Sequence, residues 1–125
     1  MRKKFISTFI VMLMLITLVL VSCGKPTFEE ACQDLRNEIT RAGYIVTYEV
    51  EEINLRESLI ITYKVDTSDS FSPETLVSLV ASDLEEEFKD RTYDLFKGLE
   101  NCAVYLCAVD RYDSSCYSVR TLYMG

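Results

Sequence analysis

The sequence predicts a small α+β domain in which an antiparallel sheet carries two helices packed on one of its faces. Two stretches have apolar residues at helical spacing, and four stretches have the alternation or the apolar composition of strands. Turn residues separate these six elements in the order α-β-β-α-β-β. Residues 27–125, which contain all six, have the length of one domain.

The first helix is predicted to begin after Thr27, because Glu30 three positions later completes a capping-box pattern. An apolar face follows at helical spacing, and Gly43 is a typical helix stop. The residues of that face are Phe28, Ala31, Cys32, Leu35, Ile39 and Ala42. Cys32 is therefore expected on the buried side of the helix.

Two strands are predicted next, at residues 44–50 and 59–65, because apolar and polar residues alternate there. In the second strand Leu59 and Ile61 are expected to face the core, and Ile60 and Thr62 the other side. The polar link around residues 53–57 predicts a hairpin with a loop of several residues.

The second helix follows a polar loop at residues 66–70 and begins at Ser72 and Pro73, a cap residue with proline at the first helical position. Its core stripe consists of Leu76, Val77, Val80, Leu84 and Phe88. The pattern allows an end near Asp90 or a continuation to Gly98.

The last two strands are predicted at residues 103–109 and 117–124, with a turn at residues 110–115. The first of them is apolar on both faces, as expected of a strand in the middle of a sheet. The second alternates between apolar and polar residues.

Residues 1–22 have the layout of an export signal. Arg2, Lys3 and Lys4 form a basic start, and the 17 residues at 5–21 are apolar apart from one serine and two threonines. The alternative, an uncleaved membrane helix, is disfavoured because about 20 residues are needed to cross ~30 Å of hydrocarbon.

The segment closes with Leu20-Val21-Ser22-Cys23, which resembles the lipobox of bacterial lipoproteins. The resemblance covers about the first 24 residues. It implies that a diacylglyceryl group is attached to the Cys23 thiol and that the chain is cleaved after Ser22. Two acyl chains on one residue anchor a protein stably in a bilayer.

This resemblance also implies where the protein lies. Residues 23–26 would be the lipidated cysteine and a short tether, of which three residues span at most about 10 Å. The domain is then expected on the outward face of the cell membrane, or on the outer membrane if the host has one, because Gly24 and not aspartate follows Cys23.

The charge of the predicted mature chain excludes nucleic acid as a partner. The protein has 13 basic and 20 acidic residues, and three of the basic residues lie in the predicted signal. The remainder carries a formal charge of 10 − 20 = −10. A domain this acidic is repelled by phosphate, and no cluster of lysine or arginine offsets the repulsion.

Four cysteines remain after Cys23, and in a small exported domain they favour disulfides, with three possible connectivities. If the last two strands turn about residues 111–112, Cys107 faces Cys116, which leaves Cys32 to pair with Cys102. Free buried thiols are the alternative. Zinc and thiol catalysis are disfavoured, because the chain has no C-x-x-C pair and no histidine.

No catalytic residue, metal site or cofactor is predicted, since the chain lacks histidine, a glycine-rich loop and a G-x-S-x-G motif. The sequence favours a non-enzymatic interaction module that binds another envelope protein or blocks an incoming one. Its contact surface is expected to be the Tyr-rich last hairpin or the open sheet face, represented by Ile45, Thr47, Glu49, Ile60 and Thr62. The alternative is a small-ligand or cation-binding lipoprotein, with an acid-rimmed pocket between helix and sheet.

Overall fold

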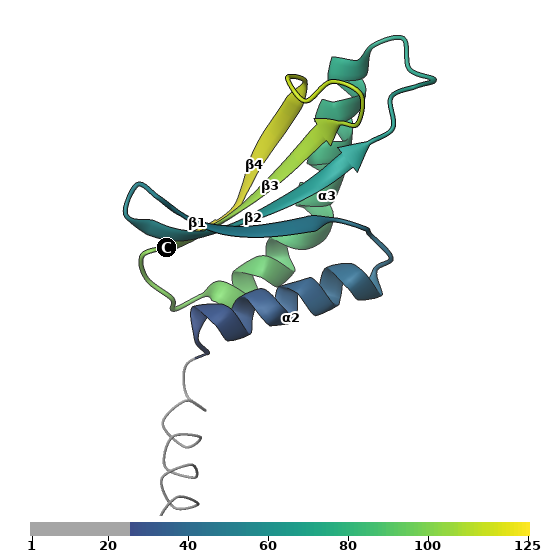
Figure 1. The fold of residues 1–125 in the computed structure, drawn as a ribbon. Helices are drawn as coiled ribbons and strands as arrows, with labels where there is room; N and C mark the ends of the chain where they lie inside the picture. The colour runs from purple at the N-terminus through teal and green to yellow at the C-terminus, as the bar shows by residue number, and fades with distance from the viewer. Residues whose placement is uncertain (1–25) are drawn as a thin grey trace, which may run out of the picture.

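The computed structural model describes residues 26–125 and places two helices against one face of a four-stranded sheet (Figure 1). The element order is α2-β1-β2-α3-β3-β4, which confirms the predicted α+β class and the predicted order. The predicted signal at residues 1–22 and the predicted lipidation site Cys23 lie outside the described residues.

The helix α2 spans Phe28–Arg41 and begins as its sequence predicts. The Thr27 hydroxyl accepts a hydrogen bond from the Glu30 amide at 3.2 Å, which satisfies one of the unpaired amides of the first turn. The helix is followed by Gly43, whose φ of +92° lies in the left-handed region that glycine adopts without strain. The buried residues of α2 are Ala31, Cys32, Leu35 and Ile39.

The strands β1, Thr47–Ile53, and β2, Arg56–Val65, form an antiparallel hairpin. The predicted loop of several residues is wrong, because only Asn54 and Leu55 connect the strands. Both have positive φ, 51° and 64°, as in the tight turns whose twist matches that of the flanking strands. The strands therefore extend further toward the turn than the polar composition of this segment suggested.

The helix α3 spans Pro73–Phe96, so the longer of the two predicted alternatives is correct. Its buried stripe continues past Asp90 through Thr92 to Phe96. Gly98, at φ +89°, then turns the chain back toward the sheet.

The strands lie in the order β1-β2-β3-β4. β3, Cys102–Asp110, and β4, Tyr117–Met124, form an antiparallel pair, but β2 and β3 are parallel. The predicted antiparallel sheet is therefore correct for the two outer pairs and wrong for the central one. The reason is that α3 carries the chain from the end of β2 back to the beginning of the sheet, so β3 starts in the same direction.

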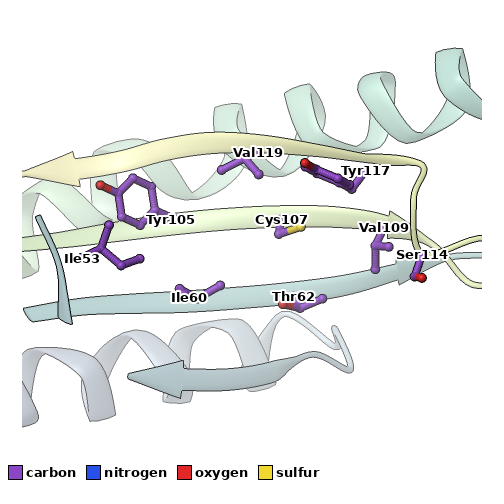
Figure 2. Close-up of a pocket in the computed structure, with 9 residues that line it drawn as sticks. All are labelled: Ile53, Ile60, Thr62, Tyr105, Cys107, Val109, Ser114, Tyr117 and Val119. Carbon is purple, nitrogen blue, oxygen red and sulfur yellow. The ribbon is translucent and has the colours of Figure 1, made fainter. Parts of the chain in front are cut away.

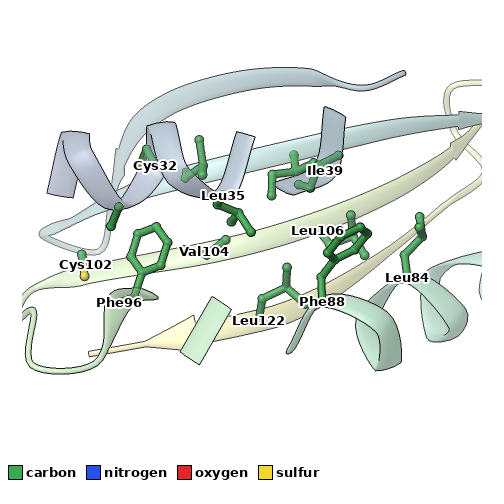
Figure 3. Packing of buried hydrophobic residues seen from close by; sticks show 13 residues of the cluster. Cys32, Leu35, Ile39, Leu84, Phe88, Phe96, Cys102, Val104, Leu106 and Leu122 are labelled. Atoms are coloured by element: carbon green, nitrogen blue, oxygen red, sulfur yellow. The ribbon is translucent and has the colours of Figure 1, made fainter. Parts of the chain in front are cut away.

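The hydrophobic core lies between the helices and the sheet (Figure 3). Leu35 and Ile39 of α2 and Phe88 of α3 meet Val104 and Leu106 of β3 there. Both helices cover this one face, as predicted, and no helix within residues 26–125 covers the opposite face of the sheet (Figure 1). The opposite face is therefore left open by the described residues.

Candidate interaction site on the open sheet face

A groove of about 580 Å³ runs across the sheet face that the helices leave uncovered (Figure 2). All four strands contribute to it, together with Ser114 from the connection between β3 and β4. Its lining consists of Ile53, Ile60, Thr62, Tyr105, Cys107, Val109, Ser114, Tyr117 and Val119.

The register of the strands brings these side chains together. Ile60 of β2 is the partner of Tyr105 of β3, and Thr62 is the partner of Cys107. Cys107 in turn lies opposite Val119 of β4. Because side chains alternate between the two faces of a strand, the residues between these positions point into the helix-covered core.

The central strand β3 explains why both faces of the sheet are apolar. Val104 and Leu106 are buried under the helices, whereas Tyr105, Cys107 and Val109 lie on the open face and are only partly buried. A strand that is apolar on both faces normally has both faces covered. In residues 26–125 only the helix side is covered, so the open face of β3 presents apolar surface to solvent.

The groove has no charged lining residue. Its polar atoms are the hydroxyls of Thr62, Tyr105, Ser114 and Tyr117 and the thiol of Cys107, and burial raises the pKa of that thiol. A protonated thiol is a poor nucleophile. An apolar floor with a few hydroxyls is suited to binding an apolar surface, and tyrosine is frequent in such interfaces.

Negative charge borders the groove on one side. Glu49 of β1 is the register partner of Ile60, so the two side chains share the open face. Glu51 lies two residues further along the same strand and is exposed. On the opposite border, β4 has no acidic residue.

The contact residues predicted on the open sheet face do not all line the groove. Ile60 and Thr62 line the groove, and Thr47 and Glu49 lie beside them on β1. Ile45 precedes β1, so its placement within a strand was wrong, and it lines a neighbouring depression that Thr47 and Thr62 share.

The tyrosines of the last hairpin are also divided among three locations. Tyr117 lines the groove, and Tyr112 lies in the connection between β3 and β4, where its hydroxyl donates to Asp66 at 3.2 Å. Tyr123 faces the helices, where its hydroxyl donates to the Leu99 carbonyl. Tyr105, which also belongs to the predicted hairpin, lines the groove beside Cys107. The sequence interpretation missed Cys107 as a groove residue, although the two-sided apolar pattern of β3 indicates it.

The register that suggested a bridge between Cys107 and Cys116 is wrong. Cys107 lies opposite Val119, and the Asp110 amide donates to the Cys116 carbonyl, so the connection is longer than a two-residue turn. The shift is an odd number of residues, which places the two thiols on opposite faces. Cys107 lines the groove, and Cys116 packs against the cluster around Val65 on the helix side.

The other two cysteines, Cys32 and Cys102, lie in the same core cluster (Figure 3). All four cysteines within residues 26–125 are free thiols in the structure. Burial, with a further contribution from the carboxylate of Glu57, raises the pKa of Cys32 to about 12. A bridge between Cys32 and Cys102 remains a prediction from the sequence.

A second cavity, of about 330 Å³, lies between α2 and the β1–β2 hairpin. Cys32 and Val50 contribute to it, and Glu29, Glu57 and Arg36 provide its charged groups. This is the kind of acid-rimmed pocket that the alternative ligand-binding function requires. Within residues 26–125, however, no three Cys, Asp, Glu or His side chains are arranged to hold a metal ion.

Comparison with protein-family models, with curated proteins and with solved structures finds no match to this chain. In the part of the chain that the structure describes, no helix is both long enough and apolar enough to cross a bilayer. The groove geometry is therefore the main structural observation that bears on function.

Proposed function

We propose that this protein is a lipid-anchored bacterial lipoprotein that acts as a non-enzymatic interaction module at the cell envelope. The open-face groove is its binding surface, and the partner is another envelope protein with an apolar contact patch. The observation that supports this proposal is a groove with an apolar floor and no charged lining residue on an otherwise acidic domain. Exposed apolar patches with a polar rim are typical of protein interaction sites.

The position of the groove relative to the chain terminus is compatible with an anchor at Cys23. The described chain enters α2 on the helix side of the sheet, opposite the groove (Figure 1). Cys23 lies three residues before Pro26, so an acyl group on it would attach the domain by its helix side. The groove would then face away from the bilayer, toward other envelope proteins.

The anchor is tested by the intact mass of the protein expressed in a bacterial host. Loss of residues 1–22 together with an added acyl mass is expected for the natural chain. The Cys23→Ser variant is expected to keep the complete signal and to gain no acyl mass. An uncleaved natural chain without added mass would contradict the lipoprotein assignment.

The groove is tested with a photo-crosslinking amino acid at Tyr105 in the full chain. We expect an adduct with one envelope protein, which is then purified and titrated against the lipoprotein directly. Thr62→Glu places a carboxylate in the groove and is expected to weaken this binding at least tenfold, about 1.4 kcal/mol. Thr75→Glu, at an exposed position in the first turn of α3, is the matched control and should bind normally.

A third variant separates this proposal from ligand binding in the second cavity. Val50→Glu introduces the same charge beside Cys32 and Glu57 and lies outside the groove. Unchanged partner binding is expected for Val50→Glu. Loss of binding with Val50→Glu but not with Thr62→Glu would instead assign the interaction to the cavity between α2 and the hairpin.

A further inference from the structure

The two edges of the sheet carry very different side chains. On β1, Glu49, Glu51 and Glu52 are all exposed, and charged residues on an edge strand discourage pairing with another strand. The other edge strand, β4, has Arg120 as its one charged residue and contains no proline or glycine. The Val119 carbonyl accepts a hydrogen bond from the Arg120 guanidinium at 3.3 Å. The other outer backbone amides and carbonyls of β4 remain available to a further strand.

The positive charge of Arg120 is paired within the domain. Its guanidinium lies 3.8 Å from the Glu85 carboxylate of α3 and donates hydrogen bonds to the hydroxyls of Ser78 and Ser82 at 3.3 and 3.2 Å. On the same helix, Lys89 forms an ion pair with Glu86 at 2.9 Å. The one charged residue of β4 is therefore paired within the domain, although the whole domain is strongly acidic.

Exposed apolar side chains gather along this edge. Tyr117, Val119 and Met124 are exposed on β4. On α3, Tyr93 is exposed beside Tyr123 of β4, with ring centroids 6.4 Å apart, and Leu79 is exposed next to Ser78, which Arg120 contacts. We define the β4 edge as the strand Tyr117–Met124 together with Leu79 and Tyr93.

We propose that two copies of this chain associate through the β4 edge, pairing β4 with β4 in antiparallel orientation about a twofold axis. The product is a continuous eight-stranded sheet, in which the two open-face grooves lie on the same side. This self-association goes beyond the proposed function, since it leaves the groove free for a different partner.

The charge distribution selects this mode over the other ways of joining two copies. In the eight-stranded sheet the two acidic β1 strands are seven strand spacings apart, roughly 34 Å at ~4.8 Å per spacing. That separation is several times the Debye length of about 8 Å, so their repulsion is screened. Pairing β1 with β1 would place six glutamates on adjacent strands. Stacking the open faces would bring Glu49 and Glu51 of both copies within roughly 10 Å.

The test uses single cysteines on the full chain in the membranes of cells that express it. Tyr117, Val119 and Thr121 are each replaced by cysteine, since all three lie on the open face of β4. Thr47→Cys is the matched control, because Thr47 is an exposed threonine on the same face at the opposite edge. A short bismaleimide is then added, and the unsubstituted chain measures the background from the native thiols.

We expect a cross-linked dimer from at least one β4 position and only background from Thr47→Cys. Adding Thr121→Lys to the reactive variant is expected to lower the dimer yield at least tenfold, because it places a like charge on each of the two paired edge strands. A melting temperature equal to that of the parent confirms that this lysine variant is folded. If it is not folded, the cysteine scan alone decides.

Three results would overturn the proposal. They are background yield at all three β4 positions, equal dimer yield from Thr47→Cys, and an adduct at Thr121→Cys whose mass contains a different protein. The first two results do not bear on the groove, because the groove experiment uses Tyr105 and Thr62, which the β4 scan leaves unchanged. Tyr117 and Val119 also line the groove, so the third result is taken from Thr121, which does not line it. Failure of self-association and failure of the proposed function are therefore distinguishable.

Discussion

Cys107 on β3 lies opposite Val119 on β4, and this register places the Cys107 thiol in the groove, apart from the other three cysteines. Cys32 and Cys102 are buried, and burial raises the pKa of both thiols. We therefore expect N-ethylmaleimide to modify Cys107 in the native protein roughly tenfold or more faster than Cys32 or Cys102. Peptide mass spectrometry over a time course at pH 8 measures the order.

The same experiment tests the register. Denaturation before labelling is the control and should make all four thiols react at similar rates. Recovery of a native peptide pair in which Cys107 is joined to Cys116 would contradict the register, because the structure places those side chains on opposite faces.

Thr67 and Asp110 form a buried hydrogen bond that ties the segment after β2 to the end of β3. The Thr67 hydroxyl donates to the Asp110 carboxylate at 2.7 Å, and both residues are 6% exposed. Thr67→Ala leaves the buried carboxylate without this donor, so we expect it to unfold more easily than Thr67→Ser by about 1–3 kcal/mol. Urea denaturation measures the difference, and equal stabilities of the two variants would show that the hydroxyl contributes nothing.

Tyr44 connects the segment before β1 to α3. Its hydroxyl donates to the Glu87 carboxylate at 2.5 Å, and this hydrogen bond is the main reason why the pKa of Tyr44 is raised to about 12. Tyr44→Phe keeps the ring contacts with Tyr63 and Phe88 and loses the hydrogen bond, which is expected to cost about 1 kcal/mol at pH 7.

The pH dependence of this difference follows from the direction of the shift. A tyrosine of the unfolded chain loses its proton near pH 10, whereas Tyr44 in the folded protein keeps its proton until about pH 12. The stabilisation is therefore complete below pH 10 and is lost as the pH rises to about 12. Denaturation of the natural chain and Tyr44→Phe at pH 9 and pH 11 should show the gap closing. A constant gap would contradict the assigned hydrogen bond.

Thr92 is a buried threonine in α3 whose hydroxyl has no hydrogen-bond partner among residues 26–125. Thr92→Val replaces the hydroxyl with a methyl group of similar shape, so we expect it to stabilise the protein by about 1 kcal/mol. Thr92→Ala removes the hydroxyl but also leaves a small void, and it is expected to give no stabilisation. Thermal and urea unfolding compare the two variants, and destabilisation by valine would indicate a partner for the hydroxyl.

The elements with local signals were predicted well from the sequence. Thr27 marks the start of α2 and Pro73 the start of α3, because caps and first-turn residues act within a few positions of themselves. The alternation around Ile60 and Ile61 assigned each to its correct face for the same reason, since strand periodicity is a local property.

Pairings between distant segments were predicted less well. The Asn54–Leu55 turn was missed because leucine rarely adopts positive φ, so composition alone favoured a longer loop. The parallel pairing of β2 with β3 depends on how α3 returns the chain, which no local pattern records. Cys116 was wrongly predicted to lie opposite Cys107 for a similar reason. The register of β3 and β4 depends on the conformation of their connection, and the polar residues of that connection specify its conformation only weakly.

The sequence by itself determined which segments are helices and strands, the acidity of the domain and the exclusion of histidine chemistry. Only the tertiary structure decided that Ile60, Tyr105, Cys107 and Val119 form one groove and that the one charged residue of the edge strand β4 is paired within the domain. The physical reason is that strand periodicity assigns a side chain to a face, whereas strand order and register decide which side chains share it. A binding surface consists of side chains that share one face, so it can be identified only when the four strands are assembled.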